Sequence, residues 1–322
     1  MQKKKNFQKN TEKRTKLQTY VHEKLDGTER EGLIVAHFGA TADVEDSDGR
    51  IYHAHLRRNA EPCITGDKVL WRLEKDNTGI VASVLPRTSL LARPEKANKV
   101  KLIAANIDTM VIVTAPYPLF SERLIDRYIV AAELLQIKPI ILFNKVDLLN
   151  DELLVEIKEY LSIYEEIGYT VLYSSVYEKY GLNNLRDVLM DKTSVLMGVS
   201  GVGKSSIIAA LTGVNNIKIG EVGLQAGKHT TTTTRLYHLP QGGNLIDSPG
   251  VREFTLWHLA PDEIIKGFVE MYAYMGECKF RNCQHNNEPG CALLQAVEEE
   301  KISSDRWESY QEVLQDMMGK RN

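Results

Sequence analysis

The sequence predicts an α/β fold class: a central domain with a mostly parallel sheet, a small β-barrel before it and a helical, cysteine-containing segment after it. Three observations predict this arrangement. Short strands with turn signals and no helical pattern fill residues 31–86. Apolar strands and amphipathic helices then alternate over residues 108–211, as in a doubly wound sheet. Three cysteines and a histidine gather between residues 278 and 291.

Composition sets the limits of the function. The 322 residues can bury a sizeable core in two or three domains. No apolar run reaches about 18 residues, so we expect no membrane-spanning helix and no membrane partner. The basic start has no apolar segment behind it, so we expect no secretory signal and a cytoplasmic protein.

The net charge of −3 is unevenly distributed along the chain. Residues 3–16 hold seven Lys and Arg residues and one acidic residue, Glu12. Such arms are disordered when free and bind polyanions by releasing counterions. We therefore predict a basic disordered arm at 1–20, which is either a nucleic-acid contact or only a solubilising tail.

Residues 21–92 are predicted to form a small closed barrel, OB-like or SH3-like. The expected strands are 32–37, 40–45, 51–56, 68–73 and 79–85, with a hairpin turn at 46–49. Barrels of this kind often bind oligonucleotides. The candidate surface groups are His53, His55, Arg57, Arg58, Trp71 and Arg72. The alternative is a spacer barrel in which Trp71 belongs to the core.

The central α/β domain is predicted at 93–258, after a polar linker bracketed by Pro86 and Pro94. Its expected strands are 108–114, 139–143, 170–173 and 193–197. Its expected helices are 121–136, 152–167 and 182–190, and a further helix follows residue 205.

The last of these strands leads into a GxxxxGKS motif that opens a helix, which is the context of a phosphate-binding P-loop. Its glycines let backbone N–H groups surround phosphate oxygens. Lys204 would reach the β- and γ-phosphates, and the Ser205 hydroxyl would hold Mg²⁺. The predicted nucleotide-binding residues of the loop are Gly198, Val199, Ser200, Gly201, Val202, Gly203, Lys204, Ser205 and Ser206.

An Asn-Lys-Val-Asp tetrapeptide at 144–147 follows a predicted strand, at the edge where open α/β sheets bind ligands. The Asp147 carboxylate could accept N1–H and N2–H of guanine, a donor pair that adenine lacks. Asn144 would hold neighbouring loops, and the Lys145 stem would lie over the base. A backbone N–H at Ser174–Ser175 could meet guanine O6. The sequence therefore predicts GTP/GDP as the nucleotide.

The segment 220–235 is polar and rich in Gly and Thr, and one of its threonines should complete the Mg²⁺ shell and sense the γ-phosphate. A DxxG motif follows, in which Asp247 would hold Mg²⁺ through water and the Gly250 N–H would contact the γ-phosphate. Val251 stands where Ras-type GTPases place a glutamine that orients water. His229 is the candidate replacement, although it could merely pack or contact a partner.

The order of the motifs is unusual, because the guanine-reading motif precedes the P-loop. A circular permutation of the GTPase domain explains that order. In the last predicted domain, 259–322, the ligands Cys278, Cys283, His285 and Cys291 form a complete Cys₃His set for a structural Zn²⁺, unless the thiols are unrelated.

Together the motifs NKVD, GVSGVGKS, GKHTTT, DSPGVREF and C-x₄-C-x-H-x₅-C resemble the ribosome small-subunit-dependent GTPase A family (RsgA, also called YjeQ or YloQ). The resemblance implies an OB-fold, a circularly permuted P-loop GTPase domain and a zinc domain. It also implies action on the small (30S) subunit and its 16S rRNA late in assembly, with GTP hydrolysis stimulated by the subunit. The family's switch threonine corresponds to Thr231, which with His229 and Lys204 completes the predicted catalytic set.

The chain departs modestly from that family. Ser174-Ser175-Val176 replaces the commoner Ser-Ala-Lys, which leaves the backbone contact to guanine possible. We expect a monomeric GTP hydrolase. The alternative is a non-catalytic, GTP-dependent RNA-binding switch, and another RNA or the large subunit is physically allowed as the partner.

Overall fold

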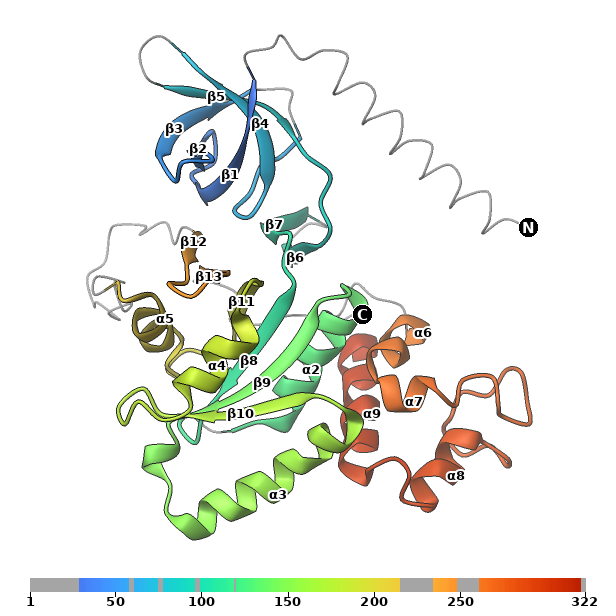
Figure 1. Ribbon diagram of the computed structural model, residues 1–322. Helices are drawn as coiled ribbons and strands as arrows, with labels where there is room; N and C mark the ends of the chain where they lie inside the picture. Colours follow the sequence, from blue (N-terminus) through green and yellow to red (C-terminus); the bar gives the residue numbers. More distant parts are fainter. Residues whose placement is uncertain are drawn as a thin grey trace, which may run out of the picture.

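The computed structural model describes residues 29–57, 61–74, 78–95, 99–118, 120–214, 234–247 and 261–319 (Figure 1). Within these ranges, no helix has both the length and the apolar character needed to cross a membrane. Several predictions fall on residues outside them: the basic arm at 1–20, Arg58, His229, Thr231, Gly250 and Val251.

Five short strands close into the predicted barrel. They are β1 (Arg30–His37), β2 (Thr41–Glu45), β3 (Ile51–Leu56), β4 (Lys68–Leu73) and β5 (Gly79–Val84). They pair in the order β1-β2-β3-β5-β4, and β4 returns to β1. The Asp46–Gly49 turn forms between β2 and β3, with the Gly49 N–H donating to the Asp46 carbonyl at 3.0 Å.

Trp71 lies in the barrel core and not on its surface, which corrects one candidate surface group. Its side chain is fully buried. The Arg30 guanidinium lies 4.4 Å from the ring centroid, and the indole N–H donates to the Glu31 carbonyl at 3.3 Å. A Cβ on Gly32 would lie 2.6 Å from the indole, so glycine makes room for the ring. Alternation alone could not show which face of β4 points inward.

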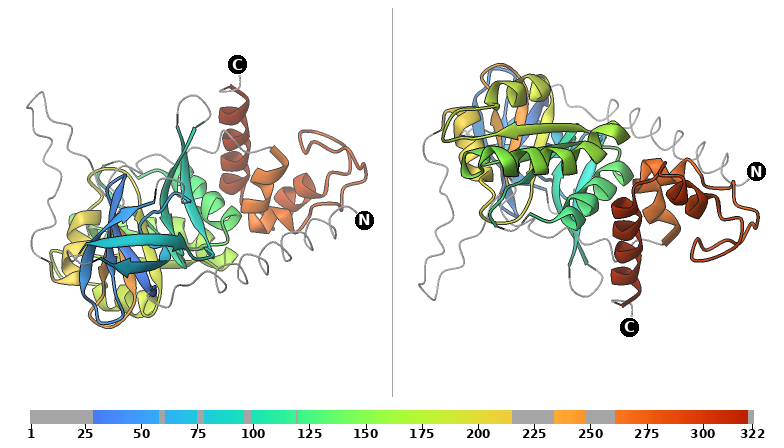
Figure 2. Two further views of the ribbon diagram at one scale, coloured as in Figure 1. Left: turned by 90° about the horizontal axis from the view of Figure 1, so that it is seen from above. Right: turned by 90° about the horizontal axis from the view of Figure 1, so that it is seen from below.

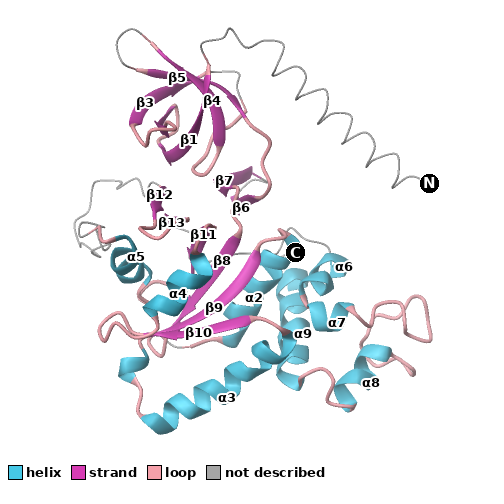
Figure 3. Ribbon diagram, viewed as in Figure 1, coloured by secondary structure: helices cyan, strands magenta, loops and turns pink. Residues whose placement is uncertain are grey.

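The polar linker predicted between Pro86 and Pro94 is partly wrong. The chain forms a two-stranded hairpin there, β6 (Leu90–Glu95) and β7 (Lys99–Ala105) (Figure 3). Pro94 sits within β6, opposite Val100. Proline cannot donate to a ladder, but a two-stranded sheet consists of edge strands, where proline is tolerated. Because of Pro94 and the charged residues around it, this segment lacks the sequence pattern of a strand.

The central sheet has the strand order β10-β9-β8-β11-β13-β12. Its strands are β8 (Thr109–Thr114), β9 (Lys138–Asn144), β10 (Thr170–Ser174), β11 (Thr193–Met197), β12 (Arg235–His238) and β13 (Asn244–Asp247). All neighbours are parallel except β12, which runs antiparallel to β13. The order reverses between β8 and β11, and ligands bind at such a switch point, beyond the carboxyl ends of the strands.

Helices cover both faces of this sheet, as in a doubly wound fold (Figure 1). They are α2 (Glu122–Leu134), α3 (Asp151–Ile167), α4 (Leu182–Leu189) and α5 (Lys204–Thr212). Ser121 occupies the N-cap position of α2 but makes no side-chain cap hydrogen bond. The predicted α/β fold class, with its closed five-strand barrel, is confirmed.

The C-terminal helices lie at the edge of the sheet domain opposite α5 (Figure 2). They are α6 (Pro261–Ile264), α7 (Val269–Tyr272), α8 (Ala292–Glu298) and α9 (Ser304–Gly319). Phe268, Met271, Trp307 and Tyr310 from this part belong to the same apolar core as Ile125 and Ile129 of α2. The last helices are therefore packed onto the sheet domain through a continuous core.

A buried polar network lies within this contact. Arg306 of α9 is 2% exposed; it donates to the Asp126 carboxylate of α2 and to Glu270 Oε1 at 2.8 Å. Burial, and then the Asp126 charge, raise the pKa of Tyr164 well above its usual value, so its hydroxyl stays protonated. That hydroxyl donates to Asp126 at 2.8 Å. The network thus joins α2, α3, α7 and α9.

Replacing Arg306 with Met should destabilise the protein by about 3–5 kcal/mol, because the change leaves a buried carboxylate without its cation. Urea denaturation measures this loss. The matched control is Arg123→Met, which removes a more exposed ion pair between the same helices, Arg123–Glu312 at 2.5 Å, and should cost under about 1 kcal/mol. Equal losses in the two variants would contradict a special role for the buried network.

Candidate functional site

Three loops meet at the carboxyl edge of the central sheet, and the Asn144 side chain joins them. Asn144 ends β9 and is 2% exposed. Its Nδ2 donates to the Val202 carbonyl in the loop after β11, at 2.8 Å. Its Oδ1 accepts from the Ser174 hydroxyl at the end of β10, at 3.0 Å. Asn144 therefore holds the phosphate loop against both loops that would face the base.

The close approach of these loops explains two of the glycines. A Cβ on Gly203 would lie 2.4 Å from Asn144 Nδ2, and one on Gly198 would lie 2.2 Å from the Val113 carbonyl oxygen. Both residues also have positive φ, +102° and +140°. A side chain at either position would be strained and would push the loop off its neighbours.

Lys145 follows Asn144 in the left-handed conformation, with φ 64°. Its ammonium donates to the Gly201 carbonyl at 2.5 Å and to the Tyr117 carbonyl at 3.0 Å. Its stem thus crosses from the base-reading motif to the P-loop. Asp147 lies two residues on, half-buried in a single 3₁₀ turn, Val146–Leu148.

The phosphate end of the site carries a cation and a carboxylate. The Lys204 ammonium donates to the Gly198 and Val199 carbonyls at 2.7 and 2.8 Å. Burial raises the pKa of Asp247, and the nearby Lys204 charge opposes that rise. Ser205 and Ser206 lie in the first turn of α5, where N–H groups are free of intrahelical partners. A hydroxyl, a half-buried carboxylate and a lysine here fit a Mg²⁺-bound phosphate chain.

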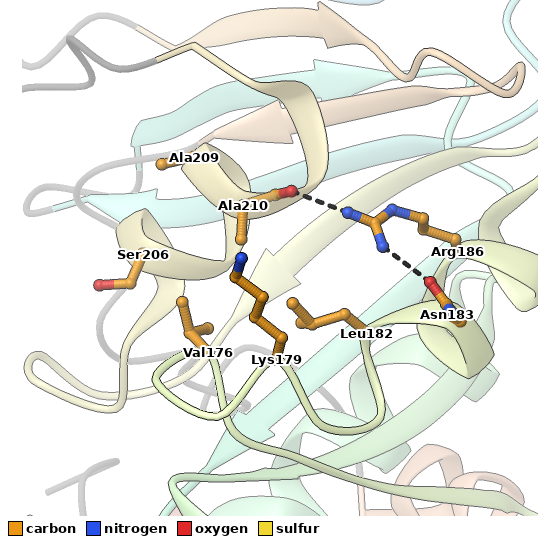
Figure 4. A pocket seen from close by; sticks show the side chains of 8 residues that line it. All are labelled: Val176, Lys179, Leu182, Asn183, Arg186, Ser206, Ala209 and Ala210. Carbon is orange, nitrogen blue, oxygen red and sulfur yellow. Dashed lines mark hydrogen bonds between the residues drawn. The ribbon is translucent and has the colours of Figure 1, made fainter.

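The other base-facing loop follows β10. The Ser175 N–H donates to the Tyr180 carbonyl at 3.1 Å, and the Ser175 hydroxyl accepts from the Glu178 N–H at 3.0 Å. This loop, α4 and α5 surround an open pocket of about 770 Å³ (Figure 4). Its lining is Val176, Lys179, Leu182, Asn183, Arg186, Ser206, Ala209 and Ala210. The pocket meets the P-loop at Ser206 and excludes Lys204 and Asp147, so it adjoins the predicted nucleotide site without containing its core.

The predicted site residues fall into two sets. The structure brings together Asn144, Lys145, Asp147, Ser174, Ser175, residues 198–206 and Asp247 at one sheet edge. His229, Thr231 and Gly250 lie outside the described residues. The sequence did not point to Tyr117, whose carbonyl accepts from the Lys145 ammonium; its place three residues beyond strand β8 was the available signal.

A second site lies in the C-terminal part. Ligand atoms of Cys278, Cys283, His285 and Cys291 all lie within 4.8 Å of one another. His285 Nδ1 is 3.5 Å from Cys278 Sγ and 3.4 Å from Cys291 Sγ, and these two sulfurs are 4.0 Å apart. A tetrahedral zinc requires sulfur–sulfur separations of about 3.8 Å and slightly shorter sulfur–nitrogen ones. The four residues therefore fit one structural zinc.

Comparison with known proteins agrees with this geometry. The model of the RsgA GTPase family matches residues 84–257, more than half of the chain. The crystal structure of YjeQ from Thermotoga maritima is 29% identical, with a TM-score of 0.74 over 90% of this chain and 99% of that one. The structure of YloQ, described as a circularly permuted GTPase, is 28% identical, with a TM-score of 0.73 over 91% and 96%. The chain belongs to the RsgA GTPase family.

Proposed function

We propose that this protein is a monomeric, cytoplasmic GTPase that binds the small (30S) ribosomal subunit through its 16S rRNA and acts late in subunit assembly. The observation that supports nucleotide binding is the pair of hydrogen bonds made by the Asn144 side chain, which hold the P-loop beside the proposed base-reading motif. Family membership supports the ribosomal part. We assign the barrel to 21–92, the GTPase domain to 93–258 and the zinc domain to 259–322, with a basic arm at 1–20.

In this proposal the chain's own residues bind and orient GTP. The P-loop N–H groups and Lys204 would hold the phosphates, the Ser205 hydroxyl would hold Mg²⁺, and Asp247 would hold the same ion through water. Lys145 covers the base, and Asp147 accepts its two N–H donors. Bound Mg²⁺ supplies charge neutralisation at the γ-phosphate. His229 and Thr231 remain the proposed groups for orienting water and completing the Mg²⁺ shell.

Two surfaces support an RNA partner. On the barrel, His53 and His55 of β3 point to the exposed side, with ring centroids 6.3 Å apart, and Phe38 lies 6.2 Å from His53. Beside the zinc cluster, Phe280 is 44% exposed and the Lys279 ammonium lies 5.6 Å from its ring. Rings and cations exposed together suit unstacked bases and phosphates.

Purified small subunits should raise the GTP turnover of this protein about tenfold or more over its turnover alone, because in this proposal rRNA places His229 and Thr231 for hydrolysis. Phosphate release, titrated with small subunits, large subunits or no ribosome, measures this. Turnover that stays at the basal rate with every addition would favour the non-catalytic RNA-binding switch.

Replacing Asp147 with Asn should weaken GTP binding about 100-fold, because the amide cannot accept both guanine donors, and should shift preference toward xanthosine triphosphate. Titration with fluorescent nucleotides measures both affinities. Asp151→Asn removes a carboxylate at the start of α3 and serves as the control, with wild-type affinity expected. Unchanged GTP affinity in Asp147→Asn would refute the base-reading role.

Replacing Cys283 with Ser should lower the bound zinc from about one ion per chain to near zero, since three ligands hold zinc far more weakly than four. Elemental analysis of the purified protein measures the metal. Asn282→Ser changes the neighbouring residue and should retain zinc. A full zinc content in Cys283→Ser would exclude this ligand set.

A further inference from the structure

Strand β12 lies between the barrel and β13 and is paired to both (Figure 1). Toward the central sheet it pairs with β13 along its whole length, from Arg235 opposite Asp247 to His238 opposite Asn244. Toward the barrel it pairs with β1 at one position, Ala36 opposite Arg235. The residue that bridges to the barrel is thus the residue opposite Asp247.

Barrel side chains contact both ends of β12. At its start, the Thr65 hydroxyl donates to the Thr234 carbonyl at 3.0 Å. At its end, the two ring nitrogens of His238 lie 2.6 Å from Glu45 Oε2 and 2.7 Å from Asn244 Oδ1. These contacts supplement a backbone pairing between β12 and β1 that spans only one position.

Thr65 is presented by a fixed part of the barrel. It is fully buried, and its carbonyl accepts from the Ala105 N–H at 3.0 Å. Two residues on, the buried Asp67 carboxylate accepts from the Ile64 N–H at 2.8 Å and from two nitrogens of Arg87 at 2.7 and 2.8 Å. A contact made by such a preorganised group costs little ordering entropy.

We propose that Thr65 and Glu45 of the barrel are positioning residues of the nucleotide site. They fix β12, and the pairing of β12 with β13 then fixes Asp247 relative to the P-loop. The inference rests on the proposed role of Asp247 toward Mg²⁺. It implies that a partner seated on the barrel acts on bound nucleotide through β12, without touching the nucleotide.

The test uses the full chain with Thr65→Val and Glu45→Ala, each of which removes one contact to β12. Thr41→Val makes the same chemical change as Thr65→Val on β2 and is the control. Release of a fluorescent GDP analogue is followed by stopped flow, in Mg²⁺ and in EDTA. Each variant should release nucleotide about fivefold faster than wild type in Mg²⁺, the effect of one lost hydrogen bond, and at the wild-type rate in EDTA. The control should match wild type in both.

Three results would overturn the inference. Release in Mg²⁺ within 1.5-fold of wild type for both variants would show that β12 does not transmit the contact. Equal acceleration with and without Mg²⁺ would show a loss of general stability and no effect on Asp247. If the wild-type protein released the nucleotide at the same rate in Mg²⁺ and in EDTA, the proposed role of Asp247 would be refuted, and the positioning role with it. Subunits are absent from the assay, so it is independent of ribosomal stimulation.

Discussion

The two-sided hydrogen bonding of Asn144 is the constraint on which the nucleotide site depends. One amide satisfies a carbonyl of the P-loop and a hydroxyl at the end of β10, so three loops from three strands share one fixed point. This arrangement requires glycine at 203, because a Cβ there would lie only 2.4 Å from the amide nitrogen of Asn144. Both polar atoms of the buried Asn144 amide have a hydrogen-bond partner, which makes this contact between the loops stable as well as specific.

The order of the motifs along the chain has little effect on how the site is assembled. Parallel strands bring their carboxyl ends to one edge whatever the order in which they are synthesised. In this chain β9, which ends at the Asn-Lys-Val-Asp motif, precedes β11, which leads into the P-loop, yet the ends of the two strands meet at one site. Because the permuted domain begins at β8, the barrel precedes it in the sequence, and the C-terminal helices follow after β13. The barrel then contacts β12, and the helices contact α2 and α3.

The barrel, the sheet, the P-loop and the Cys₃His cluster could be predicted because each has a local pattern: a turn, an alternation or a spacing. It missed what depends on distant partners. The sequence assigned no role to Arg306 or His238, since nothing near either residue shows that Asp126 or Glu45 will lie beside it. The β6 strand was missed for a local reason, the proline at 94. Trp71 stayed open between the barrel surface and the barrel core, because alternation cannot say which face of a strand is inside.

The buried pair of Arg306 and Asp126 has a consequence for the order in which the chain is made. These residues are 180 positions apart, and Thr65 and Thr234 are 169 apart, so neither contact can form until most of the chain has left the ribosome. The barrel strands and the pairs β8–β9 and β9–β10 are local and can form first. During that interval Asp126 is without Arg306, and α2 is without the apolar side chains of the C-terminal helices that pack against it. The nascent protein therefore exposes, until its last helix is synthesised, the surface on which that helix packs.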